Sequence, residues 1–363
     1  MNISVIGGGN MGCVLATKFS QKHNVILYIS NRNNEIINYQ NNMKMYNPDK
    51  QHTITGNISK ITDSLEYAIN NSDYIFITYP QFLFKNLSEQ MLPYLNNKHI
   101  IFVPGSGGAE FWFKNAIDKG CTITGLQRVH AVTRIVEKGK LATEKGIREA
   151  LKIASIPMAY NNVAKEVISQ LFEMPVELLP NYANITLINS NPILHTSRLY
   201  CLFNDYSNDK QYNYIPLFYE EWDEESSDLL IKLDNELRGV LDTLNNKGLD
   251  MSGIVPILNH YESTNQTELT KKLNSINSLK GIETPHIKVG NMCIPDFSSR
   301  YFISDFPYGL DLILEFALIC NTQCDNIKKV SDWYHNITAT QQQFYLNDFK
   351  INDINDIVKF YNA

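Results

Sequence analysis

The chain has 363 residues, which is too long for one ordinary hydrophobic core and predicts two domains. With 44% hydrophobic and 19% charged residues, the composition is that of a globular protein. Its formal net charge of −6 argues against nucleic-acid binding, because recognition of phosphates requires a basic surface. No apolar run approaches the ~20 residues of a membrane helix and no basic leader precedes the first strand pattern, so we expect a cytoplasmic protein without a membrane partner.

The segment VIGGGNMGCVLA near the N-terminus contains the spacing G-x-G-x-x-G between a predicted strand and a predicted helix. In this context the first glycine allows a tight turn, the second lets a pyrophosphate approach the backbone, and the third lets the helix pack on the strand. A structural glycine turn without a ligand is the alternative. The cofactor-binding residues expected here are Gly7, Gly9, Asn10, Met11 and Gly12.

The second predicted strand covers residues 25–29 and is followed directly by Ser30, Asn31 and Arg32. An NAD site usually carries an acidic residue at this point, which binds the ribose 2′-hydroxyl. Here no carboxylate repels a 2′-phosphate, and Arg32 could pair with one. The sequence therefore favours NADP(H) as cofactor. The alternative is that Arg32 is solvated and that NAD(H) binds without the usual acid.

Two further strands are predicted at 73–78 and 100–103, and a helix is predicted from 109 to 119. Strands that are apolar on both faces and alternate with helices are typical of a parallel sheet covered by helices. Ligands of such sheets bind at the carboxyl ends of the strands, where Pro80 and the segment PGSGG follow. We expect Pro80 beside the cofactor, and the glycine segment is either a second ligand contact or an ordinary tight turn.

The strand–helix alternation fades at Pro180, after which helices and long polar connections are predicted. Apolar residues at helical spacing indicate helices in EESSDLLIKLDNELRGVLDTLNN and YGLDLILEFALICN, and a loop with three tyrosines covers 204–216. Six scattered cysteines lack metal-ligand spacing, so we expect reduced thiols and no metal. The predicted fold is an α/β N-terminal Rossmann domain over 1–180, with a doubly wound, mostly parallel sheet, and an all-α C-terminal domain over 181–363.

The segment INSNPILHTSRLY raises a separate question, because it places His195 one turn after an Asn-Pro pair. Proline is favourable in the first turn of a helix, so Asn191-Pro192 predicts a helix start. A histidine held at that point could fill the core, donate a proton or act as a base.

Together with PDFSSRYFISDFPYGL further along, this segment resembles the opine dehydrogenase family of the octopine, nopaline and carboxyethyl-norvaline type. The helical domain of that family carries N-P-x-x-H and R-Y-x-x-x-D-x-P-Y-G-L elements, and the resemblance covers both domains in order. It implies the reductive condensation of an amino acid with a 2-oxo acid, with hydride from a nicotinamide cofactor. The product is a secondary amine dicarboxylate.

The resemblance implies that His195 is the catalytic acid/base, that Asp305 is its carboxylate partner, and that Arg300 binds a substrate carboxylate. Histidine moves protons near neutral pH, aspartate fixes its tautomer, and a guanidinium grips a carboxylate through two hydrogen bonds. Each residue also has a structural interpretation: a core histidine, a helix-capping aspartate and a surface arginine.

The resemblance also implies substrate contacts at Arg134, Asn191 and Ser106, where Ser106 stands in place of a glutamine that is common in the family. Pyruvate is the expected oxo acid, and the sequence does not identify the amino acid. Two other functions stay open: a 2-oxo acid reductase of the ketopantoate reductase type and a non-catalytic NADPH-sensing protein. The helical half also leaves a homodimer open.

Overall fold

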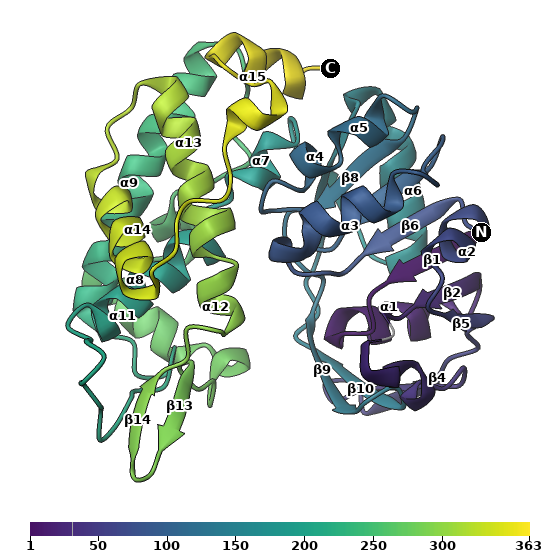
Figure 1. Cartoon of the computed structure of the whole chain (residues 1–363), viewed down its shortest axis with the longest axis horizontal. Helices are drawn as coiled ribbons and strands as arrows, with labels where there is room; N and C mark the ends of the chain where they lie inside the picture. Colours follow the sequence, from purple (N-terminus) through teal and green to yellow (C-terminus); the bar gives the residue numbers. More distant parts are fainter. Residues whose placement is uncertain (31) are drawn as a thin grey trace. The chain divides into compact units, whose positions relative to one another are not determined.

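The computed structural model describes residues 1–30 and 32–363 and divides the chain into two compact units (Figure 1). The first unit comprises Met1–Thr186 together with Tyr361–Ala363, and the second comprises Leu187–Phe360. The sequence pattern had placed the change of domain slightly earlier, at residue 180, and gave no sign that the C-terminal residues return to the first unit.

The first unit is built on an eight-stranded sheet in the order β12-β11-β8-β7-β6-β1-β2-β5. All neighbours are parallel except β8 and β11, so the mostly parallel α/β sheet is confirmed. The predicted strands at 25–29, 73–78 and 100–103 correspond to β2, β6 and β7. The strands are β1 (Asn2–Ile6), β2 (Asn24–Tyr28), β5 (Lys60–Thr62), β6 (Tyr74–Ile77), β7 (His99–Phe102), β8 (Thr122–Leu126), β11 (Leu151–Ile156) and β12 (Val176–Leu178).

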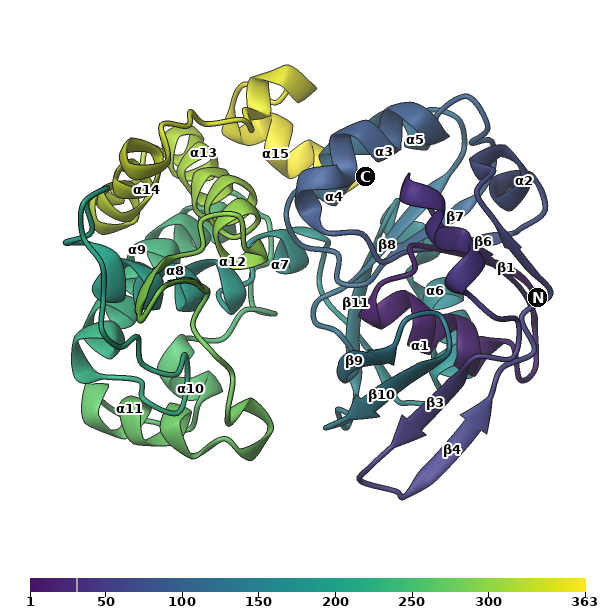
Figure 2. The same cartoon turned by 60° about the horizontal axis from the view of Figure 1, so that its bottom comes forward.

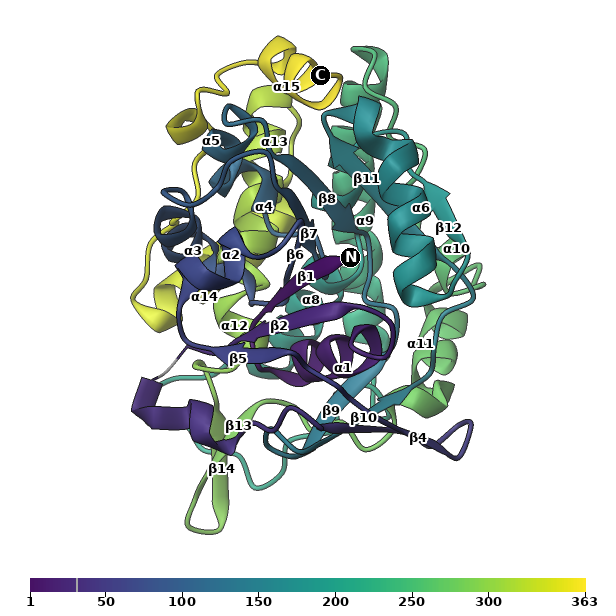
Figure 3. The ribbon, with the colours of Figure 1, turned by 90° about the vertical axis from the view of Figure 1, so that its right-hand side faces the viewer.

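Helices cover both faces of this sheet, and Figure 3 shows α6 on one side of the strands and α3 and α5 on the other. The helix predicted over 109–119 is wrong in part, because Phe113 leaves helical geometry and its ring is buried against Phe102 at 5.0 Å. The helices are α1 (Asn10–Phe19), α2 (Leu65–Asn70), η2 (Gln81–Leu83), α3 (Phe84–Met91), α4 (Ala109–Trp112), α5 (Lys114–Ile117), η3 (Met158–Tyr160), α6 (Asn161–Phe172) and α7 (Ala183–Thr186).

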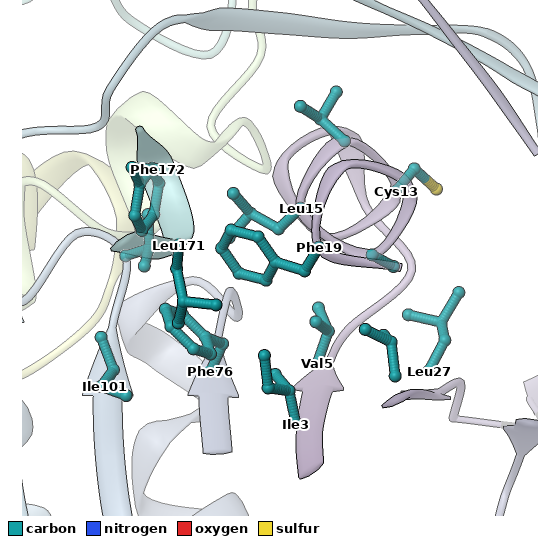
Figure 4. Packing of buried hydrophobic residues seen from close by; sticks show 14 of the residues in the cluster. Ile3, Val5, Cys13, Leu15, Phe19, Leu27, Phe76, Ile101, Leu171 and Phe172 are labelled. Atoms are coloured by element: carbon teal, nitrogen blue, oxygen red, sulfur yellow. The ribbon is translucent and has the colours of Figure 1, made fainter. Parts of the chain in front are cut away.

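The core of the first unit lies between the sheet and the pair α1 and α6. Figure 4 shows Phe19 of α1 and Phe172 of α6 beside the strands that carry Val5 and Phe76. The Phe19 ring lies 5.0 Å from that of Phe76 and 5.3 Å from that of Phe172. Burial of such large rings contributes much of the free energy that holds the helix carrying the glycine turn against the strands.

A second, four-stranded sheet of the first unit has the order β4-β3-β10-β9 and packs against α1 (Figure 2). The buried Glu144 carboxylate of this sheet contacts Lys18 of α1 at 2.8 Å and His130 at 2.6 Å. The sequence pattern had not predicted this sheet. Its strands are β3 (Lys44–Asn47), β4 (His52–Thr55), β9 (Val132–Glu137) and β10 (Leu141–Lys145), and η1 (Arg32–Asn38) precedes them.

The second unit is mainly helical, and the two long apolar helices expected from the sequence are confirmed as α9 and α13. The hairpin of β13 and β14 departs from the all-α expectation. The elements are α8 (Asn191–Phe203), α9 (Glu224–Asn246), α10 (Ile257–His260), α11 (Gln266–Ser275), η4 (Asn277–Leu279), β13 (His286–Val289), β14 (Met292–Pro295), α12 (Arg300–Ile303), η5 (Phe306–Leu310), α13 (Asp311–Cys320), α14 (Asp325–Thr338), η6 (Leu346–Phe349) and α15 (Ile354–Tyr361). Within the described residues, no helix is long and apolar enough to cross a membrane.

A buried carboxyl group joins distant parts of the first unit. Glu110 of α4 accepts hydrogen bonds from Thr186 and, at 2.6 Å, from the hydroxyl of Tyr361. Its second oxygen is buried without a hydrogen-bond partner among the described residues. Burial raises the pKa of Glu110 to about 7, against the lowering effect of its hydrogen bonds. The carboxyl is therefore largely protonated below neutral pH.

Candidate active site

The glycine turn between β1 and α1 has the geometry of a phosphate-binding turn. Gly7 has a positive φ of 118°, and a Cβ at Gly12 would lie 1.8 Å from the Gly7 carbonyl oxygen, so neither position accepts a side chain. A Cβ at Gly9, in contrast, would meet nothing within 4 Å. The turn is closed where the helix approaches the strand and open where a pyrophosphate would lie, so it fits a dinucleotide.

A cavity of about 670 Å³ continues from this turn along the end of β2. It is lined by Gly9, Ser30 and Pro80, three of the residues that the sequence assigned to the cofactor. Glu35 and Lys138 also line it, and the Lys138 ammonium lies 2.8 Å from the Glu35 carboxylate. Such a volume is typical of a ligand site.

Of the other residues that the sequence assigned to the cofactor, Asn10 and Met11 are not among the residues that line this cavity. The Asn10 side chain accepts a hydrogen bond from the Ile135 backbone N–H at 2.7 Å and thereby connects α1 to β9. Met11 packs against the hydrophobic core. Asn31 lies outside the described residues, and so does the side chain of Arg32.

Sequence reasoning missed Glu35 and Lys138. Glu35 lies only a few residues after the end of β2, so a wider search for acidic residues would have found it. Lys138 lies between β9 and β10, and its place in the cavity depends on a sheet that the sequence pattern did not predict. No local signal marks that lysine.

His195 lies one turn into α8, as the Asn191-Pro192 pair predicted. Its Nδ1 lies 2.7 Å from Oδ2 of Asp305, and both side chains are buried. Asp305 immediately precedes η5, a turn of π-helix whose Gly309 packs against Pro192. A Cβ at Gly309 would lie 2.9 Å from Cβ of Pro192, so this glycine allows η5 to approach α8 and bring the carboxylate to the histidine.

The second ring nitrogen of His195, Nε2, lies 2.7 Å from the hydroxyl of Tyr219. The Tyr301 ring packs nearly perpendicular to the imidazole with 4.4 Å between centroids, and the Phe218 ring packs against the imidazole at 5.5 Å. Because an ionised Asp305 accepts a hydrogen bond from Nδ1–H, a neutral His195 accepts the hydroxyl hydrogen of Tyr219 at Nε2. Burial raises the pKa of Tyr219 well above its ordinary value, so this residue stays a phenol.

The predicted substrate residues lie on both units. In the second unit, Arg300 is exposed at the start of α12, near enough to Tyr219 to oppose the rise in its pKa, and Asn191 is exposed at the start of α8. In the first unit, Arg134 is exposed on β9 and donates to the Thr133 carbonyl oxygen at 2.9 Å, and Ser106 is half-buried in the turn after β7. Of these residues, Arg300 is adjacent in sequence to Tyr301, whose ring packs against His195.

Across residues 1–30 and 32–363, no group of three or more histidine, cysteine, aspartate or glutamate side chains is placed to hold a metal ion. The side chains that hydrogen bonds bring together in the second unit are His195, Asp305 and Tyr219.

Two family models match the chain, one over each unit. Residues 178–338 match the family described as NAD/NADP octopine/nopaline dehydrogenase, alpha-helical domain. Residues 2–172 match the family described as NAD-dependent glycerol-3-phosphate dehydrogenase N-terminus.

Relatives and solved structures agree with these matches. Tauropine dehydrogenase of Arabella iricolor is 24% identical over 291 residues, which cover 75% of this chain and 73% of that protein. Octopine dehydrogenase of Pecten maximus is 24% identical over 287 residues, which cover 75% and 72%. A solved structure of octopine dehydrogenase with NADH and L-arginine has a TM-score of 0.85 at 20% identity and covers 98% of this chain and 97% of that one. That likeness shows a shared fold.

Proposed function

The chain belongs to the opine dehydrogenase family, and from that premise we propose that it is an NAD(P)H-dependent opine dehydrogenase. It would condense an amino acid with a 2-oxo acid, pyruvate by analogy with the family, and reduce the product to a secondary amine dicarboxylate. The observation that carries this proposal is the buried His195–Asp305 pair on the helical domain. This pair supplies acid/base chemistry, which a cofactor-sensing protein without catalysis would not need.

The residues of the second unit account for the proton transfers of this reaction. His195 accepts a proton from the substrate ammonium group, so that the free amine can attack the oxo carbon. The histidine then returns the proton to the hydroxyl that leaves as water, which produces the C=N bond. Asp305 holds Nδ1–H and stabilises the imidazolium between these steps. Arg300 aligns a substrate carboxylate through its planar guanidinium. When bound, the nicotinamide cofactor supplies the hydride that reduces the C=N carbon.

For the cofactor we propose a preference for NADP(H), with NAD(H) as the second choice. The cavity beside the glycine turn contains Ser30 at the end of β2 and the ammonium of Lys138. The Glu35 carboxylate, which would repel a 2′-phosphate, is paired with that ammonium. A 2′-phosphate with its larger charge would compete with Glu35 for Lys138 and form a charge-assisted hydrogen bond.

The experiment that tests the reaction follows NADPH absorbance with purified protein, pyruvate or 2-oxoglutarate, and pooled amino acids, omitting each component in turn. Oxidation that requires both an oxo acid and an amino acid supports the proposal, and dividing the pool then identifies the amino acid. Oxidation with an oxo acid alone would instead indicate a simple 2-oxo acid reductase. Binding of NADPH without turnover in any mixture would contradict the catalytic proposal.

A further inference from the structure

We propose that Tyr219 is a catalytic residue that relays the proton between His195 and the substrate. This inference rests on the proposed function, since it concerns the same proton transfer. Its basis is the environment of the imidazole, in which each ring nitrogen already has a partner from the chain. Asp305 lies 2.7 Å from Nδ1 and the Tyr219 hydroxyl lies 2.7 Å from Nε2.

The ring of His195 is held in this orientation by its neighbours. Tyr301 packs edge-on against it, and Phe218 stacks on Tyr301 with 4.9 Å between centroids and 5° between planes. Tyr219 belongs to the same aromatic cluster and packs on Phe218 at 4.8 Å. The Tyr219 hydroxyl occupies the hydrogen-bonding position at Nε2, so a substrate group exchanges a proton with this nitrogen either through the tyrosine hydroxyl or after displacing it.

The position of Arg300, together with its proposed role, gives a second reason to place Tyr219 on the substrate side of the histidine. Arg300 directly precedes Tyr301, whose ring packs against His195 with 4.4 Å between centroids, and its positive charge opposes the rise in the pKa of Tyr219 that burial causes. Arg300 is also the residue proposed to bind a substrate carboxylate. In the proposed relay, a 2-oxo acid held by Arg300 presents its reacting oxygen to the phenol.

The relay balances without forming a charged tyrosine. In the step that releases water, the Nε2–H of the imidazolium passes to the oxygen of Tyr219. The hydroxyl hydrogen of Tyr219 passes at the same time to the departing substrate hydroxyl. The carbon–oxygen bond breaks, water leaves, and both His195 and Tyr219 end neutral. Burial of Tyr219, which disfavours tyrosinate, suits a relay that never accumulates the anion.

The test compares the wild type with Tyr219→Phe, which keeps the ring and removes the hydroxyl. We expect kcat to fall about 10²-fold or more, with the KM for NADPH unchanged. Tyr334→Phe is the matched control, since Tyr334 is also a buried tyrosine of the second unit. It should retain wild-type turnover, and thermal melts should show all three proteins folded. Full activity in Tyr219→Phe, or a lowered KM for the oxo acid with kcat retained, would overturn the relay.

A proton inventory and the variant His195→Asn extend this test to the cases in which Tyr219→Phe alone does not decide. If Tyr219→Phe does not fold, the proton inventory of the wild type in mixtures of H2O and D2O still decides. Transfer of two protons in one step gives a curved plot, whereas a linear plot contradicts the relay. His195→Asn separates the two proposals. Loss of turnover in His195→Asn with full activity in Tyr219→Phe refutes the relay alone, whereas full activity in both refutes the proposed site.

Discussion

Gly309 of η5 and Pro192 of α8 are in contact, and a Cβ added to Gly309 would lie 2.9 Å from Cβ of the proline. This contact sets the distance between two segments that lie far apart in the sequence, because Asp305 precedes η5 and His195 follows Pro192 by less than a turn. The proposed catalytic pair therefore depends on a glycine that is not one of its members.

The first prediction concerns that glycine. Gly309→Ala should force η5 away from α8, with a loss of about 1–3 kcal/mol in the free energy of unfolding. Turnover should fall further than stability explains, because Asp305 would move with η5. Urea denaturation and kcat measured on the same preparation test this. An alanine variant with unchanged kcat would show that the contact does not position the carboxylate.

The second prediction concerns Asp305 itself. Asp305→Asn should lower kcat about 10²- to 10⁴-fold, because an amide leaves the imidazolium unstabilised and the tautomer unfixed. Asp311→Asn is a matched control, since Asp311 forms another buried carboxylate–histidine pair, 2.9 Å from His335. We expect the control to lose stability and to retain kcat in the protein that folds. Equal effects on kcat would mean that Asp305 has only a structural role.

The third prediction separates two glycines of the dinucleotide turn. Gly9→Val adds a side chain into open space, so the free energy of unfolding should change little while NADPH binding weakens about tenfold to a hundredfold. Gly12→Ala should instead destabilise the first unit, because its Cβ would collide with the Gly7 carbonyl oxygen. Fluorescence titration of NADPH and thermal melts test the pair. Wild-type affinity in Gly9→Val would exclude the turn as the pyrophosphate site.

The fourth prediction concerns the choice of cofactor. Lys138→Met should raise the KM for NADPH about tenfold to a hundredfold, through loss of a charge-assisted hydrogen bond of about 1.5–3 kcal/mol, and leave the KM for NADH nearly unchanged. Lys140→Met is the control, since Lys140 is paired with Glu137 on the same hairpin outside the lining of the cavity. KM values of both variants measured with NADPH and with NADH test whether Lys138 contacts the 2′-phosphate. Equal effects of Lys138→Met on the two cofactors would refute the proposed phosphate contact.

The fifth prediction is a pH dependence that arises from Glu110. Its pKa is about 7 in the folded chain and has an ordinary value of 4.5, so between these values the folded state binds more protons than the unfolded state. Stability should therefore fall as the pH rises from 4.5 through 7, by about 3 kcal/mol from this group. Glu110→Gln keeps the shape and removes the ionisation. In urea titrations at a series of pH values, the free energy of unfolding of this variant should fall less steeply with pH than that of the wild type. An equally steep fall would show that Glu110 is not the source of the pH dependence.

The sequence predicted the parallel strands and the long helices because their signals are local. Apolar runs mark β2, β6 and β7, and leucines at helical spacing mark α9. The sheet of β3, β4, β9 and β10 escaped prediction because its strands are largely exposed or half-buried and lack apolar runs, and because its central pair, β3 with β10, joins segments far apart in the chain. The break at Phe113 escaped for a related reason, since burial of one ring outweighs local helix propensity.

The candidate site divides in the same way. His195 and Asp305 could be named from the sequence because a family resemblance carries both motifs, although 110 residues separate them. Tyr219 belongs to no recognised motif, and its contact with His195 can be recognised only in the folded chain, where the segment before α9 lies beside α8. Lys138 and Glu35 likewise meet only in the folded chain. Residues whose proposed roles depend on such contacts can be recognised only once the fold is known.

The buried contact between Tyr361 and Glu110 has a consequence for how the chain folds during synthesis. The first unit includes Tyr361–Ala363, so a ribosome that has made only its first 186 residues has not yet made all of its core. Until residue 361 emerges, Glu110 lacks the hydrogen bond from the Tyr361 hydroxyl, and the space of the Tyr361 ring is unfilled. Although domains usually fold in the order in which they are made, the final consolidation of this N-terminal unit waits for translation of the helical unit.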